Sequence, residues 1–339
     1  MTDPLERALS DLRRKWVPDA RLGVFEVSVA PAASAQNPAR LVGATTSRDA
    51  FAGLQRIAPD FGLVMEVGVL PLEGAPHEAK AVVTAAVAPL FAVPEIRGEQ
   101  VSEALHGEAA DVLEQRGDWL RVRAADGYHA WTHRGYVATG PGHWADDWIG
   151  RARATAVRAE LRDGSDRLRL PIGGKVALRK DGSVETADGR LWSVGSGAVR
   201  ADGEWHAEAR FIAAPEWALR WYGGAPYRWG GRTEWGIDCS GLVQATHTVR
   251  GSPLPRDSDL QLGAGREVPI ASDGAGYQAG DLLFFAEAGR VTHTALWAGA
   301  GRVVHATLGH GGVGSDDLFG DSGVARRLRD GLVGVRRVK

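Results

Sequence analysis

The chain has 339 residues, of which 44% are hydrophobic and 24% are charged, and its formal net charge is -2. This composition excludes a disordered chain, and the near-neutral charge gives no electrostatic reason to expect a nucleic acid or an anionic membrane as partner. Cys239 is the single cysteine, so an intrachain disulfide is excluded. The N-terminus lacks the apolar core of a secretory signal, and the most apolar stretch, 81–93, is shorter than the roughly 20 residues of a membrane-spanning helix. The sequence therefore predicts a cytoplasmic protein.

Residues 1–80 mix helical and strand patterns. Apolar positions at helical spacing predict a helix over Leu5–Trp16, and Ser47 is a candidate N-cap for a second helix that ends at Ile57. Alternating patterns predict strands over Leu22–Val29 and Gly62–Leu72. We interpret this segment as an α+β elaboration packed on the following domain, and the sequence indicates no function for it.

Residues 81–142 have the pattern of short strands joined by tight turns. Two expected strands flank Arg116-Gly117-Asp118, and a further turn lies at Asp126-Gly127. The run GDWLRV followed by DGYHAW resembles the end of a bacterial SH3-like barrel. Residues 143–213 repeat the pattern less regularly, with turns at Asp181-Gly182 and Asp188-Gly189. The sequence thus predicts two SH3-like β-barrels, the second of them divergent.

Residues 214–339 form the last predicted domain, which has α+β character. A short helix is expected over Glu216–Tyr222, because Pro215 suits the first position of a helix. Strands are expected over 281–285, 293–297, 302–306 and 331–336, separated by glycine turns.

Cys239 is the candidate nucleophile of this domain. It follows a glycine-rich loop and precedes apolar residues at helical spacing, which predicts a helix that begins at or just after the cysteine. Unpaired backbone N–H groups and the helix dipole favour a thiolate there, so we expect a lowered pKa for Cys239. The alternative is a buried cysteine that acts as a small hydrophobic residue.

His293 and His305 are the candidate partners of the thiol. Both lie on expected strands, and a hairpin with its turn at Gly299–Gly301 brings the two side chains close together. One imidazole would act as the general base and the other would orient it. The alternative of three zinc ligands is disfavoured, because spacings of 54 and 12 residues lack the short pairs typical of zinc sites. The sequence therefore predicts no metal and no cofactor.

Five separated segments resemble the NlpC/P60 cysteine peptidases. They are YRWGGRTEWGIDCSGLVQ, LPRDSDLQ, AGDLLFF, VTHTALWAG and RVVHA, in the order and spacing of that family. The resemblance implies a papain-like NlpC/P60 catalytic domain over 214–339, so the expected fold is α+β with two SH3-like β-barrels ahead of it. This domain order is similar to that of the gamma-D-glutamyl-L-diamino acid endopeptidases of the dipeptidyl-peptidase VI type, which implies recycling of cell-wall peptides in the cytoplasm.

The resemblance also implies a role for each matched residue. Cys239 would be the nucleophile, His293 the base and His305 the residue that orients the base. Tyr227 matches the tyrosine whose hydroxyl completes the oxyanion hole with the Cys239 N–H group, although packing beneath the helix is an alternative role. The implied substrate-contacting residues are Trp229, Asp238, Ser240, Arg256, Ser258 and Tyr128.

The implied substrate begins with a free L-Ala joined to D-Glu and is cleaved after the γ-linked D-Glu. The first barrel would close the far end of the groove, where Asp238 and Tyr128 would lie near the free amine. A buried ammonium needs a carboxylate partner, which would be Glu95 or Glu99, and the sequence does not choose between them. The alternative is that both are solvated surface charges.

The hypothesis from the sequence is a cysteine peptidase that hydrolyses the γ-D-glutamyl–diamino acid bond of free murein peptides and releases L-Ala-D-Glu for recycling. It leaves open whether the diamino acid is meso-diaminopimelate, lysine or ornithine. One alternative is an amidase or acyltransferase of the same fold that acts on another acyl substrate. The other is a non-catalytic protein that binds wall peptides.

Overall fold

The N-terminal unit is a small α/β layer. The computed structural model describes residues 3–34, 38–71 and 80–338. In the N-terminal unit, β1 and β2 are antiparallel and β2 and β3 are parallel. Both helices and both strands predicted here are confirmed, although Leu72 lies outside the described residues and β2 was not predicted. The elements are α1 (Pro4–Trp16), β1 (Phe25–Ala30), β2 (Arg40–Thr45), α2 (Arg48–Ile57), the 3-10 turn η1 (Pro59–Phe61) and β3 (Val64–Val69).

The second unit is a seven-stranded sheet with the strand order β10-β4-β7-β8-β9-β5-β6. The β7–β8 hairpin turns at Gly117-Asp118 and the β8–β9 connection contains Asp126-Gly127, as the sequence predicts. Alternate residues such as Leu120 and Val122 are buried in the core of the unit. The elements are β4 (Lys80–Val83), β5 (Val87–Phe91), β6 (Gln100–Leu105), β7 (Ala109–Arg116), β8 (Trp119–Arg123), β9 (His129–His133), the 3-10 turn η2 (Arg134–Tyr136) and β10 (Val137–Gly140).

The third unit is a five-stranded sheet that follows helix α3. Strand β11 pairs with β12, β13 and β15, and its register shifts just after Val157. The turns predicted at Asp181-Gly182 and Asp188-Gly189 join β13 to β14 and β14 to β15. The elements are α3 (Gly142–Arg151), β11 (Ala154–Asp163), β12 (Asp166–Leu170), β13 (Lys175–Leu178), β14 (Val184–Glu185), β15 (Leu191–Ala201) and α4 (Asp202–Phe211).

The prediction of two SH3-like barrels is not confirmed as stated. In the second unit, β6 and β10 are edge strands, so the described strands leave the sheet open. In the third unit, β11 is shared among three neighbours because its two halves pair differently on either side of the register shift. The tight-turn pattern in the sequence predicts hairpins correctly, but it does not specify how the hairpins close on one another.

The C-terminal unit carries a six-stranded sheet with the order β18-β23-β19-β20-β21-β22. Alternation along β19 places Leu282 and Phe284 in one core with α5 and α6, whereas Leu283 and Phe285 face α8. The expected helix and strands of this unit are confirmed. The elements are α5 (Ala214–Tyr222), β16 (Arg232–Thr233), β17 (Gly236–Ile237), α6 (Cys239–Thr248), α7 (Ser258–Gln261), β18 (Arg266–Glu267), β19 (Leu282–Glu287), β20 (Arg290–Gly299), β21 (Arg302–Thr307), the 3-10 turn η3 (Leu308–His310), β22 (Gly312–Asp317), α8 (Gly323–Gly331) and β23 (Leu332–Arg337).

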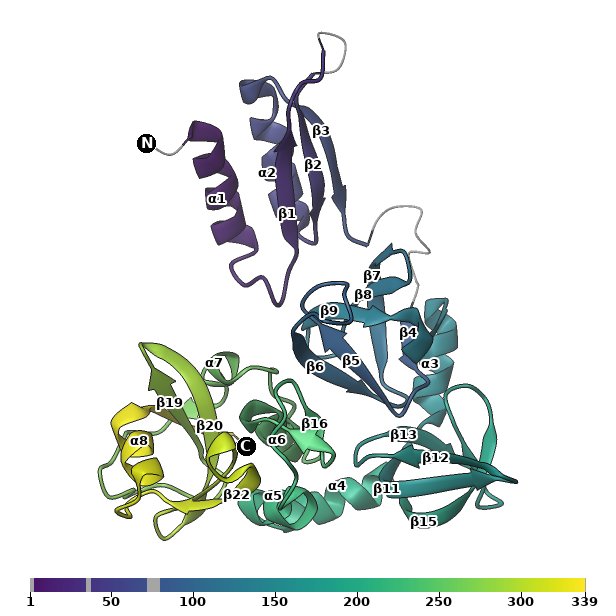
Figure 1. The fold of residues 1–339 in the computed structure, drawn as a ribbon, viewed down its shortest axis with the longest axis vertical. Coiled ribbons are helices and arrows are strands. Elements are labelled where there is room, and N and C mark those ends of the chain that lie inside the picture. Colours follow the sequence, from purple (N-terminus) through teal and green to yellow (C-terminus); the bar gives the residue numbers. More distant parts are fainter. Residues whose placement is uncertain (1–2, 35–37, 72–79, 339) are drawn as a thin grey trace.

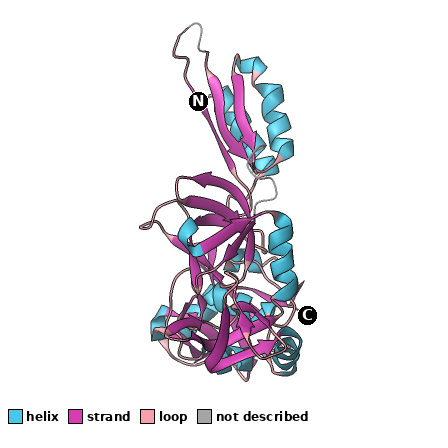
Figure 2. Cartoon of the chain, turned by 90° about the vertical axis from the view of Figure 1, so that its right-hand side faces the viewer, coloured by secondary structure: helices cyan, strands magenta, loops and turns pink. Residues whose placement is uncertain are grey.

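The four units are arranged around the second one. The N-terminal unit extends away from the others, and the loop between α1 and β1 points back toward the C-terminal unit (Figure 1). After a quarter turn the molecule is a column with the N-terminal layer at its upper end (Figure 2). None of the described helices is long and apolar enough to cross a membrane.

Polar contacts fasten the second unit to the C-terminal unit. Arg232 forms a bidentate ion pair with the Glu108 carboxylate, at 2.9 and 3.1 Å. It also donates to the Glu103 carbonyl oxygen at 2.6 Å. Gln244, in α6, donates to the Asp126 carboxylate at 2.8 Å. These contacts set the position of the β8–β9 turn relative to the start of α6.

Candidate active site

Cys239 is the first residue of α6, as the sequence predicts. The preceding Asp238 is the N-cap, and its Oδ1 accepts the N–H of Gly241 at 2.7 Å. A Cβ atom at Gly241 would lie 2.3 Å from the carbonyl oxygen of Gly231, so a larger residue would push the helix away from the loop beneath it. The glycine therefore allows the start of α6 to pack closely against the preceding loop.

Asp238 is held by a buried ion pair. Arg256 is 1% exposed and donates to both carboxylate oxygens of Asp238, at 3.0 and 2.7 Å. Arg256 also donates to Ser240 Oγ at 2.8 Å and to Ser102 Oγ, in the second unit, at 3.1 Å. Asp238 and Arg256 thus position the first turn of α6, and the charge of Asp238 is compensated inside the protein.

A chain of hydrogen-bonding side chains runs away from the thiol. His293 Nε2, on β20, lies 2.7 Å from His305 Nδ1, on β21. His305 Nε2 in turn lies 2.7 Å from Asp316 Oδ2, on β22. We call His293, His305 and Asp316 the relay. Its direction matches a base that is oriented by a second ring, which is itself anchored by a carboxylate.

The predicted closeness of the two histidines is confirmed, but the hairpin register differs. Leu296 pairs with Val304 and Trp297 with Val303, so the register is offset by two residues from a direct pairing of His293 with His305. The offset arises because the hairpin turns at Ala300 and Gly301, between Gly299 and its partner Arg302, which is later in the chain than a direct pairing requires. The rings still meet because side chains diagonal to one another across a strand pair are within reach of long side chains.

The start of α6 faces the strand that carries the base. Cys239 Sγ lies 4.0 Å from the carbonyl oxygen of Thr292, the residue before His293. Because Nε2 of His293 is engaged with His305, Nδ1 is the ring nitrogen that remains for the thiol. Tyr227 is also near the thiol, since burial followed by the charges of Cys239 and Asp238 raises its pKa.

The expectation of a lowered thiol pKa is wrong. Burial, followed by the neighbouring charge of Asp238, raises the pKa of Cys239 to about 12. Burial and the proximity of His305 lower the pKa of His293 to about 3. The physical reason is that a thiolate here would be buried and would lie beside the Asp238 carboxylate, and both effects favour the neutral thiol. The resting pair is therefore a thiol and a neutral imidazole.

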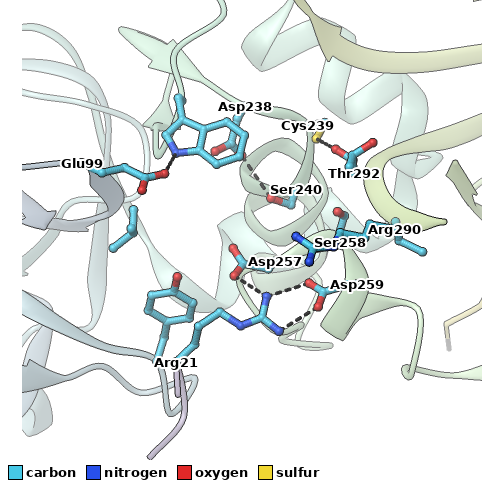
Figure 3. Close-up of a pocket in the computed structure, with 14 residues that line it drawn as sticks. Arg21, Glu99, Asp238, Cys239, Ser240, Asp257, Ser258, Asp259, Arg290 and Thr292 are labelled. Carbon is cyan, nitrogen blue, oxygen red and sulfur yellow. Dashed lines mark hydrogen bonds and ion pairs between the residues drawn. The ribbon is translucent and has the colours of Figure 1, made fainter. Parts of the chain in front are cut away.

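A cavity of about 760 Å³ opens beside Cys239 (Figure 3). Cys239 and Thr292 lie at one end of it, and Arg21 with Asp257 and Asp259 lies at the other. The residues that line it are Arg21, Glu99, Val101, Tyr128, Trp229, Asp238, Cys239, Ser240, Asp257, Ser258, Asp259, Arg290, Val291 and Thr292.

Most of the residues singled out from the sequence meet at this cavity. Those that line it are Cys239, Asp238, Ser240, Trp229, Ser258, Tyr128 and Glu99. Tyr227, His293, His305 and Arg256 are not among the described residues that line it. Of the two candidate acids, Glu99 accepts a hydrogen bond from Trp229 Nε1 at 3.0 Å, whereas Glu95 is exposed and is not among the described residues that line the cavity.

Four residues of this region were missed by reasoning from the sequence. Asp257 stands between two residues that the family resemblance singled out, so its position was a usable signal. Asp316 and His310 meet through β22 and η3, and Asp316 Oδ2 lies 3.3 Å from His310 Nε2. Arg21 comes from a segment with no motif, and no local pattern marks it.

The one group of potential metal ligands found in the described part of the chain shares two residues, His305 and Asp316, with the relay. Ligand atoms of His305, His310 and Asp316 lie within 4.8 Å of one another. The hydrogen bond from His305 to Asp316 already accounts for this arrangement, so we assign the group to the relay and not to a metal.

Two family models match the chain in separate regions. The NlpC/P60 family model matches residues 224–328. The model of the bacterial dipeptidyl-peptidase Sh3 domain matches residues 90–134. The first range contains Cys239, His293 and His305, and the second lies within the seven-stranded sheet.

Two similar curated proteins are matched over more than two thirds of their own length. The chain is 30% identical over 259 residues to a dipeptidyl-peptidase 6 of Lysinibacillus sphaericus, which covers 70% of this chain and 91% of that protein. It is 28% identical over 215 residues to a gamma-D-glutamyl-L-lysine dipeptidyl-peptidase of Bacillus subtilis, which covers 58% of this chain and 69% of that protein.

Solved structures agree in fold. An NlpC/P60 family protein from Bacillus cereus superposes with a TM-score of 0.62 at 20% identity, covering 76% of this chain and 99% of that chain. An NlpC/P60 endopeptidase from Photobacterium damselae superposes with a TM-score of 0.53 at 14% identity, covering 93% of this chain and 75% of that chain. Because the similarity to the Lysinibacillus protein extends over nearly all of that protein and the family model spans Cys239, His293 and His305, the chain belongs to the NlpC/P60 family of cysteine peptidases.

Proposed function

We propose that this peptidase hydrolyses the γ-D-glutamyl–diamino acid bond of murein peptides that begin with a free L-Ala, and that it releases L-Ala-D-Glu for cell-wall recycling. The observation that carries the proposal is the polarity of the cavity, which has a thiol at one end and carboxylates at the other. The names of the Lysinibacillus and Bacillus relatives support the same class of substrate.

The geometry supports nucleophilic catalysis by Cys239. The thiol proton moves to Nδ1 of His293 as sulfur attacks the γ-carbonyl carbon of D-Glu. The imidazolium then gives this proton to the amine of the diamino acid as the C–N bond breaks, which leaves a thioester on Cys239. Water attacks the thioester with His293 again as base, and the dipeptide leaves with a free γ-carboxylate.

The negative charge that develops on the carbonyl oxygen needs donors near Cys239. The backbone N–H of Cys239 and the hydroxyl of Tyr227 are the candidates, because burial raises the pKa of Tyr227 and keeps it a donor at neutral pH. Loss of one such donor typically costs about 2.7–4 kcal/mol in the barrier. His305 and Asp316 hold the imidazole in the orientation that this transfer requires.

The opposite end of the cavity suits a substrate ammonium. Tyr128 is buried and hydrogen-bonds to Asp257, and Glu99 lies on the same wall. Asp238, which the sequence predicts near the amine, is buried and paired with Arg256. Asp257 shares the single guanidinium of Arg21 with Asp19 and Asp259, so the carboxylates outnumber their cation and Asp257 and Glu99 are the better acceptors. A peptide whose amine is acetylated brings no cation to these carboxylates, so we expect it to bind more weakly.

Product analysis by mass spectrometry tests the proposal. L-Ala-γ-D-Glu-diaminopimelate and its N-acetyl derivative are incubated with the native protein and with Cys239→Ala. We expect L-Ala-D-Glu from the free peptide alone, and no product with Cys239→Ala because the nucleophile is absent. Replacing diaminopimelate by lysine or ornithine in the same assay identifies the accepted diamino acid.

Each other outcome has a definite meaning. Equal cleavage of the acetylated peptide would contradict recognition of the amine but would keep the peptidase. No cleavage of either peptide by the native protein would contradict the proposed substrate and would favour another acyl substrate. Binding of the peptides without cleavage would favour the non-catalytic alternative.

A further inference from the structure

One residue of the N-terminal unit reaches the substrate cavity. Arg21 lies in the loop between α1 and β1 and lines the cavity together with Tyr128 and Ser258. The carbonyl oxygen of Arg21 accepts the N–H of His129 at 2.9 Å, which fastens the loop beside Tyr128. Arg21 lies outside both ranges that the family models match, so this contact is an addition to the matched domains.

Every donor of the Arg21 guanidinium is already engaged. Nη1 donates to Asp257 Oδ2 at 2.9 Å and to Asp259 Oδ1 at 2.8 Å, and Nη2 donates to Asp259 Oδ2 at 2.7 Å. Nη2 and Nε donate to the two oxygens of Asp19 at 2.6 and 3.0 Å. A guanidinium has five N–H groups, so none remains for a carboxylate of the substrate. Arg21 therefore does not bind an anionic ligand directly.

Arg21 and its three aspartate partners form a cluster whose net charge is negative. One guanidinium faces the carboxylates of Asp19, Asp257 and Asp259, which leaves two negative charges uncompensated within the cluster. Figure 3 shows Arg21 bridging Asp257 and Asp259 at the end of the cavity opposite Cys239. The charge that this end attracts is positive, and the bridge fixes where the carboxylate oxygens point.

We propose that Arg21 is a specificity-determining residue: it closes the amino end of the substrate cavity and holds Asp257 and Asp259 as an anionic wall for the N-terminal ammonium of a peptide. The identity of the peptide rests on the proposed function, whereas the chemistry of the wall does not. The N-terminal unit is then part of the active site, and a residue ahead of L-Ala would meet the Arg21 side chain.

The kinetic test compares two peptides in three proteins. The peptides are L-Ala-γ-D-Glu-diaminopimelate and the same peptide extended by an N-terminal glycine. The proteins are the native chain, Arg21→Ala and the control Arg14→Ala, whose guanidinium pairs with Asp11 on the exposed face of α1. We expect Arg21→Ala to raise KM for the free peptide about tenfold and to leave kcat within about twofold, because Asp257 and Asp259 lose the ion pairs that fix their carboxylates for the ammonium. We also expect the preference for the free over the extended peptide to fall about tenfold, because the Arg21 side chain no longer closes the cavity. Arg14→Ala should leave both values unchanged.

Three kinetic outcomes would overturn the inference. An unchanged preference for the free over the extended peptide in Arg21→Ala would show that Arg21 does not close the amino end of the cavity. A lower KM for the free peptide would show that Arg21 competes with the ammonium for Asp257. If thermal unfolding shows that Arg21→Ala has lost its fold, the same kinetic comparison is made with Arg21→Lys and Asp259→Asn. An unchanged preference for the free peptide in both variants would also overturn the inference.

A binding measurement separates this inference from the proposed function. Isothermal titration of Cys239→Ala, with and without Arg21→Ala, uses the dipeptide L-Ala-D-Glu and its N-acetyl form. We expect Arg21→Ala to weaken binding of the free dipeptide about tenfold and to leave the acetylated one unchanged, since only an ammonium uses the wall. If the native protein cleaves no murein peptide but Arg21→Ala weakens binding of the free dipeptide only, the proposed function is wrong and the role of Arg21 in binding the ammonium is supported. If the tripeptide is cleaved but the loss is absent, the wall fails and the proposed function stands.

Discussion

At the scale of single residues, the site combines a protonated thiol with a neutral base. Burial raises the pKa of Cys239 and lowers that of His293, so neither is charged at neutral pH in the free protein. A neutral pair avoids the cost of two buried charges, and the imidazolium forms only as the substrate develops its own charge. We expect the carboxylate of Asp316, two hydrogen bonds away, to stabilise the imidazolium when it forms, because its charge raises the pKa of His293.

Asp316 is therefore expected to be a positioning residue whose loss affects rate more than substrate binding. Asp316→Asn should lower kcat roughly 10- to 100-fold, because His305 loses the carboxylate that orients it, and should leave KM nearly unchanged. The charge of Asp316 raises the pKa of both histidines against the effect of burial. Removing that charge lowers both pKa values, so the acid limb of kcat/KM should move to lower pH.

The pH–rate profile of the peptidase reaction measures this effect. His293 must be neutral to accept the thiol proton, so activity falls as the pH drops through its pKa, which lies well below the ordinary value for histidine. Asp317→Asn is the matched control, because Asp317 caps the turn at Phe319 and does not touch the relay. An acid limb that stays in place or moves to higher pH in Asp316→Asn would contradict the relay.

At the scale of secondary-structure elements, the start of α6 depends on the pair formed by Asp238 and Arg256. Asp238 caps the helix and accepts from the loop N–H of Gly230 at 2.8 Å. Arg256 precedes α7 and links the two helices through Asp238 and Ser240. The nucleophile is thus placed by a buried ion pair that joins two helices and the loop between β16 and Tyr227.

Removing Arg256 should be strongly destabilising. Arg256→Met leaves the Asp238 carboxylate buried without its cation, which typically costs about 3–5 kcal/mol. Urea unfolding of the two proteins measures the change in the free energy of unfolding. Arg14→Met is the control, because its exposed pair with Asp11 is worth at most about 1 kcal/mol. A loss below about 1 kcal/mol for Arg256→Met would show that the pair does not anchor the helix.

At the scale of the whole molecule, the cavity beside Cys239 is lined by residues of three units. The C-terminal unit supplies Cys239 and the relay, the second unit supplies Tyr128 and Glu99, and the N-terminal unit supplies Arg21. The cavity therefore exists only while the units keep their relative positions. Arg232 is central to this arrangement, because it joins the short β16 strand to Glu103 and Glu108 in the second unit.

Arg232→Met should thus separate substrate binding from the reactivity of the thiol. Loss of the bidentate ion pair with Glu108 weakens the contact between the second unit, which carries Tyr128, and the C-terminal unit. KM for the free peptide should therefore rise about tenfold. The rate of Cys239 alkylation by iodoacetamide should stay within about twofold, since α6 and β20 belong to one unit. Arg134→Met, at an exposed pair with Asp118, is the control. A parallel loss of alkylation would mean that the second unit shapes the nucleophile as well.

Local patterns in the sequence predicted many of the helices and strands and singled out the candidate reacting groups. The glycine-rich loop ahead of Cys239, the two histidines on neighbouring strands and the aspartate–glycine turns depend on residues close together in the chain, so periodicity and spacing predict them. The pKa of Cys239 was mispredicted because burial and the role of Asp238 depend on packing. Sheet closure was likewise undetermined, since hairpin signals carry no information on which distant strands pair.

Only the tertiary structure decided which distant side chains share the cavity. Both Glu95 and Glu99 are exposed, but only Glu99 lines the cavity, because it lies on the side of the turn that faces Trp229 and accepts the hydrogen bond of its Nε1. Asp316 joins the relay through the pairing of β21 with β22, and Arg21 joins the cavity through a loop that crosses between units. The sequence by itself determined the peptidase family and singled out Cys239 as the candidate nucleophile. The groups proposed to position and limit the substrate come together through contacts such as Arg21 with Asp257 and Trp229 with Glu99, between residues far apart in the chain, which no local pattern encodes.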